Sequence, residues 1–313
     1  LQKKQLYKIT TANNKIITIT SDHLTPTTNG DKFATELTTE DFIAFNNRTL
    51  DAVPEKDEHL TYEQGFAVGL YAGDGSGYIP KNDNWSNRIV YSLNKANEDN
   101  KDIDIVQKAL NHMGIANKIT SYYDKNVFKL EITSDVLYEF IMKWVNGKYA
   151  NDKEFNIKCL LQRKDVRQGI IDGWYASDGG NSNRIYSIST HLIKTGEVIF
   201  TSLGLNTVIS VDSRPNEDRF LKADGTYYKN NYELHCIRWY SMKNKRSMDG
   251  VYKVINNTEY FKINSIEEVN SDYENVYCFE MKSHEPYFTL PNGMITHNCR
   301  MLNDLSKQKQ FQS

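Results

Sequence analysis

An internal repeat constrains the fold of this chain more than any other feature. "QGFAVGLYAGDG" (residues 64–75) and "QGIIDGWYASDG" (residues 168–179) agree at seven of twelve positions and lie 104 residues apart. Small residues recur at every fourth position of each segment, and on a helix these positions form one stripe. Such a stripe lets a second helix backbone approach closely. We therefore expect two related helices that pack against each other along these stripes.

Each repeated segment ends in an aspartate, Asp74 or Asp178, and the following glycine suits the end of a helix. Packing the two stripes together would bring both carboxylates to the same end of the helix pair. Adjacent carboxylates repel unless a cation lies between them, and oxygen ligands suit Mg²⁺. The pattern predicts a Mg²⁺ site built from Asp74 and Asp178 with the neighbouring Gly73 and Ser177. The alternative is two helices that cross at glycines, with each aspartate only capping a turn.

The similarity between the halves continues beyond these helices. "NRIVYSLN" (residues 87–94) and "NRIYSIST" (residues 183–190) alternate as strands do, and "HMGIANKI" and "SLGLNTVI" each close a helix at a glycine. Each half is predicted to run helix, hairpin, helix and further strands. Two such halves give a pseudo-twofold monomer that matches a DNA site with two half-sites.

The segments "GLYAGDG" and "GWYASDG" resemble the signature helices of the LAGLIDADG homing endonucleases. The resemblance implies an (αββαββα)₂ fold, with repeat one at about 60–150 and repeat two at about 160–250. It also implies that Asp74 and Asp178 hold divalent metals that hydrolyse double-stranded DNA. An alternative is a maturase-like module that binds DNA or RNA without cutting, although the presence of both acids argues against a dead site.

The same resemblance places curved sheets in the major groove of DNA. Polar residues on the strands and adjoining loops are then candidates for DNA contact, and any one of them could equally be a solvated surface residue: Lys81, Asn84, Arg88, Lys129, Asn183 and Arg184. A catalytic lysine is common in these enzymes, and "KNKR" offers Lys243, Lys245 and Arg246 without a feature that selects one.

Residues 1–53 and 257–298 take no part in the repeat and contain short alternating, β-rich pieces. Asn292-Gly293 predicts a hairpin turn before the last strand. If both flanks form one all-β unit, the repeat region is an insertion within it. The fold would then bring Thr20 and His23 close to the run His297-Asn298-Cys299.

Three motifs in these flanks resemble the Hint (intein) splicing domain, an all-β horseshoe: "TSDH" (residues 20–23), "VYCFEM" and the terminal "MITHNC" (residues 294–299). The predicted class is α+β, an all-β Hint scaffold interrupted by the endonuclease repeat. Its parts are 1–55 and 256–298 for the Hint domain, 56–255 for the endonuclease and 299–313 for a C-extein.

The Hint resemblance implies a chemistry for these residues that needs no cofactor. Thr20 and His23 would polarise an upstream scissile peptide bond, and Cys299 would accept the acyl group. Asn298 would then cyclise to a succinimide, with His297 as proton donor or polariser. The resemblance favours splicing over a Hint domain used only for autoproteolysis, because cleavage alone needs no downstream nucleophile.

Two further residues have roles implied by the resemblance. His284 would hydrogen-bond at the same junction, and Cys278 would tune the thiol and proton transfers; a core histidine and a small buried apolar residue are the alternatives. The four cysteines lack the CxxC spacing of a zinc site and suggest no disulfide framework: Cys159, Cys236, Cys278 and Cys299. They favour a reducing, cytoplasmic location.

The chain departs from the Hint pattern at its start. The family carries a Cys or Ser nucleophile tens of residues before the Thr-x-x-His block, whereas this sequence begins with Leu1 and has nineteen residues before Thr20. We expect that a separate N-terminal intein fragment supplies this block or that the sequence is truncated. "CRMLNDL" after the junction is similar to a segment of anaerobic ribonucleotide reductases, the expected host; any protein whose insertion site begins with Cys is the alternative.

Bulk charge does not suggest nucleic-acid binding, because the net charge is −2. DNA binding would have to come from local clusters of lysine and arginine. No apolar run approaches the length of a membrane span, so we expect no membrane partner.

Overall fold

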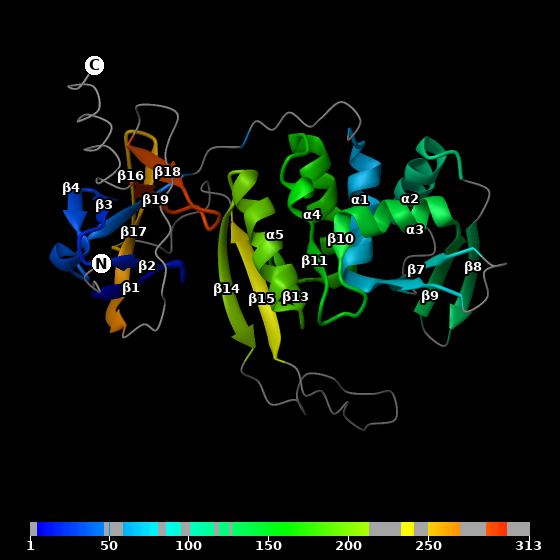
Figure 1. The fold of residues 1–313 in the computed structure, drawn as a ribbon. Coiled ribbons are helices and arrows are strands. Elements are labelled where there is room, and N and C mark those ends of the chain that lie inside the picture. The colour runs from blue at the N-terminus through cyan, green and yellow to red at the C-terminus, as the bar shows by residue number, and fades with distance from the viewer. Residues whose placement is uncertain are drawn as a thin grey trace, which may run out of the picture. The chain divides into compact units, whose positions relative to one another are not determined.

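The computed structural model describes residues 5–46, 50, 59–80, 86–94, 101–115, 119–124, 127–212, 233–240, 250–269 and 286–298. The chain divides into two compact units (Figure 1). The flanking unit comprises residues 1–48 and 241–313, and the inserted unit comprises residues 49–240. The sequence placed these boundaries at 55 and 255 instead.

The flanking unit is built on one antiparallel sheet in the order β2-β1-β17-β5-β3-β4, with β16 also paired to β17. The strands are β1 (Leu6–Thr11), β2 (Ile16–Thr20), β3 (Leu24–Thr27), β4 (Gly30–Phe33), β5 (Phe42–Phe45), β16 (Tyr252–Ile255) and β17 (Thr258–Val269). A short 3₁₀ helix, η1 (Ala34–Glu36), follows β4. The strand β17 is the centre of the sheet, because one part of it pairs with β1 and the other with β5.

The period-two pattern of β17 explains how this sheet is buried. Phe261 and Ile263 point to the core, where they pack with Ile9, Ile43 and Phe45. The aromatic rings of Phe45 and Phe261 meet edge to face at 4.9 Å between centroids. This core fixes the register of the strands that come from the two ends of the chain.

A hairpin of β18 (Tyr287–Thr289) and β19 (Ile295–His297) carries the last described residues of the chain. The predicted turn is confirmed: Gly293 has a φ of 89°, and the Leu290 N–H donates to the Met294 carbonyl at 2.8 Å. A β-bridge between Phe45 and Met294 connects the hairpin to β5. The sheet thereby positions the residue after β19, which is Asn298.

The inserted unit contains two halves of the same topology. The first comprises α1 (Tyr62–Asp74), β6 (Gly75–Tyr78), β7 (Arg88–Asn94), α2 (Lys101–His112), β8 (Ile119–Asp124), β9 (Val127–Thr133) and α3 (Asp135–Trp144). The second comprises α4 (Lys164–Asp178), β12 (Gly179–Gly180), β13 (Arg184–Ser187), α5 (Thr190–Ser202), β14 (Asn206–Asp212) and β15 (Leu234–Tyr240). Their sheets have equivalent orders, β6-β7-β9-β8 and β12-β13-β15-β14, which confirms the repeat.

The link between the halves consists of β10 (Val145–Asn146), β11 (Glu154–Phe155) and the 3₁₀ helix η5 (Ile157–Cys159). The predicted glycine ends of α2 and α5 are also confirmed, since Gly114 and Gly204 have φ angles of 70° and 74°. Within the described part of the chain, no helix is long and apolar enough to cross a membrane.

Helices α1 and α4 pack against each other through the predicted small residues. A Cβ atom added at Gly69 would overlap the carbonyl oxygen of Ile170 and lie 2.8 Å from the Trp174 nitrogen. A Cβ at Gly173 would overlap the Phe66 carbonyl oxygen in the same way. Only glycine at these positions permits the two backbones to touch.

Candidate functional site

The contact between α1 and α4 continues to their last turns and brings the two predicted aspartates together. A Cβ atom at Gly73 would lie 3.0 Å from the carboxyl carbon of Asp178. Burial, and after it the charge of Asp74, together raise the pKa of Asp178 to about 7. Burial also raises the pKa of Asp74. The charge of Asp74 therefore makes the ionised form of Asp178 less favourable.

The glycines after these aspartates end the helices for a reason other than a left-handed backbone. Gly75 and Gly179 have φ angles of −82° and −70°, which any residue can adopt. A Cβ at Gly75 would overlap the Tyr71 ring, and one at Gly179 would overlap the Tyr175 backbone and ring. Glycine is therefore required here by crowding between the helix end and the first strand of each sheet.

Lys153, just before β11, lies beside the two carboxylates and was not found by sequence reasoning. Its side chain is 2% exposed, and its ammonium donates to the carbonyl oxygens of Tyr71 (2.7 Å), Gly73 (3.2 Å) and Gly75 (2.7 Å). Burial lowers its pKa to about 8, opposed by the charges of Asp178 and Asp74. The cation thus binds carbonyl groups at the end of α1 and the start of β6, where the negative end of the helix dipole favours a positive charge.

The residues at this end of the helix pair fit a divalent cation. The ammonium of Lys153 has three N–H groups, and the three backbone carbonyls use all of them. The half-buried Asp178 and the exposed Asp74 consequently face one cation whose three N–H groups are all used by backbone carbonyls. Among the described residues no group of three or more His, Cys, Asp and Glu side chains gathers, so a metal here would be held by these two carboxylates and by backbone oxygens.

The two other predicted ligands have their own hydrogen bonds. The Gly73 carbonyl accepts from Lys153, and the Ser177 hydroxyl donates to the Trp174 carbonyl at 2.9 Å. The Trp174 indole N–H donates to Asp178 at 3.3 Å and orients that carboxylate. The geometry therefore favours Asp74 and Asp178 over the neighbouring side chains as metal ligands.

The second site lies in the flanking unit, at the end of the β18–β19 hairpin. The Nδ1–H of His297 donates to the carbonyl oxygen of Asn298 at 2.7 Å, and this carbonyl belongs to the peptide bond before Cys299. The Asn298 N–H donates to the Pro286 carbonyl at 2.7 Å, and the residue is only 9% exposed. The backbone of Asn298 is therefore fixed, with a hydrogen-bond donor on the carbonyl that its own side chain could attack.

His23 joins this junction from the other end of the chain. Its Nε2 shares a hydrogen bond of 2.6 Å with the hydroxyl of Thr296. Burial lowers the pKa of His23, and the charge of His297 lowers it further. The two histidines therefore lie close enough to influence each other's charge, and His23 is favoured in its neutral form.

The comparison with protein families decides the identity of this arrangement. The model of the intein splicing domain matches residues 1–298 of the chain. The chain belongs to the intein splicing-domain family. A comparison with curated proteins finds no match.

Solved structures similar to the intein include three with LAGLIDADG or homing endonuclease in their description. The homing endonuclease I-DmoI in complex with DNA and Ca has a TM-score of 0.42 at 16% identity, covering 57% of the intein and 83% of that chain. I-WcaI bound to its DNA recognition sequence has a TM-score of 0.33 at 11% identity, covering 58% and 79%. The N-terminal LAGLIDADG domain of DUF199/WhiA has a TM-score of 0.33 at 10% identity, covering 60% and 80%.

The structure of the intein brings some predicted junction residues together. Thr20 ends β2, and its carbonyl accepts from the His23 N–H at 3.0 Å, so the Thr-x-x-His block forms a turn. Thr296, the partner of His23, was not singled out in the sequence. Cys278, His284 and Cys299 lie outside the described residues.

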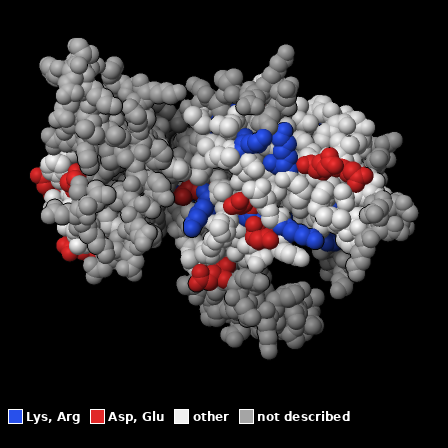
Figure 2. Space-filling model, viewed as in Figure 1, with Lys and Arg blue, Asp and Glu red and all other residues white. Residues whose placement is uncertain are grey.

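The predicted DNA contacts that the structure describes lie on or next to the two sheets of the inserted unit. Arg88 pairs with Glu131 at 3.1 Å, and Lys129 donates to Ser92 at 2.7 Å. Asn183 has a φ of 53° in the turn before β13, and Arg184 begins that strand. Outside the described residues are Lys81, Asn84, Lys243, Lys245 and Arg246. Figure 2 shows basic and acidic side chains interspersed on one face of the inserted unit.

Proposed function

We propose that the inserted unit of this intein is a metal-dependent endonuclease that cuts double-stranded DNA at the inteinless host allele. The observation that carries the proposal is the meeting of Asp74 and Asp178 at the ends of two glycine-packed helices. Asp178 is half-buried and the charge of the exposed Asp74 raises its pKa, which is an arrangement that a divalent cation stabilises. We propose Mg²⁺ as that cation.

A bound divalent metal would activate water and stabilise the leaving oxygen of phosphodiester hydrolysis. The residues of the chain hold the two carboxylates in place for this role. The Trp174 indole orients Asp178, and Lys153 fixes the last carbonyl groups of α1, to which Asp74 is attached. The buried positive charge of Lys153 also limits the repulsion between the carboxylates.

We propose that Asn298 releases the intein from its C-terminal neighbour by cyclisation. The side-chain amide nitrogen would attack the Asn298 carbonyl carbon, the bond to the Cys299 nitrogen would break, and that nitrogen would take up a proton. The Nδ1–H of His297 is aimed at the carbonyl oxygen on which negative charge develops. The products are a C-terminal succinimide and a free amine on Cys299.

The other junction residues have roles that follow from this geometry. His23, held by Thr296 and favoured as a neutral ring, would act on the upstream peptide bond together with Thr20, and Cys299 would accept its acyl group. His284 and Cys278 would assist. We further propose a cytoplasmic location and, from "CRMLNDL", an anaerobic ribonucleotide reductase as the host.

The C-terminal step is tested by the intact mass of the purified chain over time at neutral pH. We expect loss of residues 299–313 and a remaining product one water lighter than hydrolysis would give. Asn298→Ala, which keeps the backbone but removes the nucleophile, should stay intact. A product with the mass of simple hydrolysis would contradict cyclisation.

The endonuclease is tested by incubating the chain with Mg²⁺ and a supercoiled plasmid library that carries randomised inserts. We expect a subset of inserts to be cut, and Asp74→Asn and Asp178→Asn each to abolish cutting. Glu139→Gln, an exposed acid of α3, is the matched control and should cut like the wild type. Cutting that survives both aspartate substitutions would overturn the assignment of this site.

A further inference from the structure

The two sheets of the inserted unit can be aligned residue by residue through their hydrogen-bond registers. Gly75, which follows Asp74, pairs with Tyr91, and Gly179, which follows Asp178, pairs with Ile185. Tyr91 and Ile185 are both fully buried. Their neighbours along each strand therefore point to the opposite, open face of the sheet.

The next row on the open face differs in charge between the halves. In the first half this row contains Val90 paired with Glu131. In the second half the equivalent row contains Arg184 paired with Arg238. The same place relative to the two aspartates therefore presents a carboxylate in one half and two guanidinium groups in the other.

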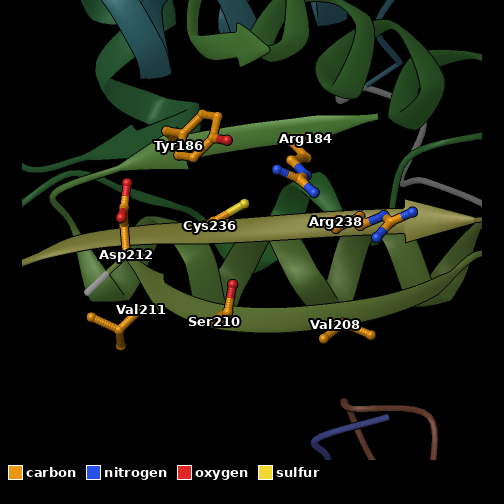
Figure 3. A pocket seen from close by; sticks show the side chains of 8 residues that line it. All are labelled: Arg184, Tyr186, Val208, Ser210, Val211, Asp212, Cys236 and Arg238. Atoms are coloured by element: carbon orange, nitrogen blue, oxygen red, sulfur yellow. The ribbon is translucent and has the colours of Figure 1, made fainter. Parts of the chain in front are cut away.

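The contacts around each of these rows fit this difference in charge. Glu131 accepts hydrogen bonds from Arg88 at 3.1 Å and from the Tyr122 hydroxyl at 3.4 Å, so these donors hold its carboxylate on this face. Arg184 and Arg238 line a hollow of about 500 Å³ on the open face of the second sheet (Figure 3). Asp212 lines the same hollow, and the N–H groups of the two guanidinium groups suit a ligand that presents several hydrogen-bond acceptors.

We infer that Arg184 and Arg238 read a guanine in one half of the DNA target and that the equivalent position of the other half excludes guanine. The inference rests on the proposed DNA binding of this unit. The guanine edge in the major groove presents two acceptors, O6 and N7, which arginine and lysine can contact, and the planar fork of arginine holds both in a fixed geometry. The carboxylate of Glu131 would repel the same edge. The target is therefore asymmetric at this pair of positions.

The test is a binding selection with the full chain and randomised double-stranded DNA, first without divalent metal and then with Mg²⁺. We expect the selected sequences to contain guanine at one position of one half-site and not at the symmetry-related position. Arg238→Ala and Arg184→Ala should each lower the preference for guanine there by about 5- to 150-fold. Lys164→Ala removes a positive charge at the other end of α4 and should leave the preference unchanged.

Arg238→Lys provides a variant that keeps the positive charge and the fold. Its guanine preference should weaken because lysine lacks the planar fork, while its dependence on salt stays the same. Guanine at both symmetry-related positions would overturn the inference. A loss of binding from Arg238→Ala that is equal for all sequences would also overturn it, because that result indicates a phosphate contact.

The outcomes separate this inference from the proposed endonuclease. Selective binding of guanine without cutting would support the inference and contradict the endonuclease. Cutting without this guanine preference would support the endonuclease and contradict the inference. Failure to bind DNA at all would overturn both.

Discussion

Substitution of one glycine between α1 and α4 tests whether close packing of the helices controls the aspartate pair. In an exposed helix, Gly→Ala stabilises by about 1 kcal/mol because alanine has the higher helix propensity. At Gly69 the added Cβ would instead overlap the carbonyl oxygen of Ile170 and lie 2.8 Å from the Trp174 nitrogen. These are backbone atoms, which cannot move aside as a flexible side chain can, so the helices have to separate.

The structure sets the size of this effect. Overpacking in a core costs about 1–3 kcal/mol, and backbone contacts place Gly69→Ala at or above the upper end. After the gain in helix propensity, we expect a net loss of about 2 kcal/mol in the free energy of unfolding. For a unit that spans residues 49–240, this corresponds to a fall in Tm of about 4–8 °C. Separation of the helices also moves Asp74 away from Asp178, so the pKa of Asp178 should fall from about 7.

Tryptophan fluorescence during thermal unfolding measures this loss selectively, because all four tryptophans lie in residues 49–240. Gly65→Ala should have a smaller effect, since its Cβ would lie 2.5 Å from the Val166 carbonyl oxygen, a weaker overlap than the one at Gly69. Glu139→Ala, on the exposed side of α3, is the control and should change stability by less than about 0.5 kcal/mol. A rise in Tm for Gly69→Ala would refute the close packing of α1 and α4.

Three further predictions concern the two sites. The pKa of Asp178 is about 7 in the folded state and about 3.9 in the unfolded state. Between these pH values the folded state therefore binds more protons, so the free energy of unfolding falls as the pH rises through this range. Without divalent metal, Asp178→Asn should therefore have a higher Tm than the wild type at pH 8 but not at pH 4. Equal Tm values for the two proteins at both pH values would contradict the raised pKa of Asp178. Lys153→Met should lower the free energy of unfolding by about 1–3 kcal/mol, since buried carbonyls lose their donor, and raise the pKa of Asp178 in a titration followed by NMR; an unchanged pKa would exclude their coupling. His297→Ala should slow C-terminal cleavage by about 10²–10³-fold at unchanged circular dichroism, and an unchanged rate would exclude its role at the carbonyl.

The helix pair could be predicted from the sequence because its packing depends on a local, periodic pattern of small residues. The small residues at Gly65, Gly69 and Gly73 repeat along one face, and the structure places them against α4. The same logic located Asp74 and Asp178 at one end. It also assigned the following glycines to helix ends, but for a conformational reason that the φ angles do not support.

Lys153 could not be predicted because its role depends on contacts distant in sequence. It contacts carbonyl groups about eighty residues earlier in the chain, and nothing in "NDKEF" marks the lysine as buried. The partnership of His23 with Thr296 is similar, since 273 residues separate the two. Motifs identify residues whose chemistry is local, whereas the residues that orient them are found only once the fold is known.

The topology of the flanking sheet explains how one chain accommodates both sites. The strand before the insertion ends at Phe45, and Phe45 pairs with Glu259 on the central strand after it. The two ends of the interruption therefore belong to adjacent strands of one sheet. Because the entropy of closing a loop grows only slowly with its length, a folded unit there adds little cost to the pairing.

The inserted unit also holds the segment through which the chain enters it. The Leu50 N–H donates to the Ser202 carbonyl at 2.8 Å, and Arg167, buried in α4, donates to the carbonyls of both Leu50 and Ser202. The register of the flanking sheet thus depends on β5 and β17, while the entry segment is held by α4 and α5. Asn298 is positioned by the flanking sheet and Asp178 by the packing of α4 on α1, so each site is maintained by its own core.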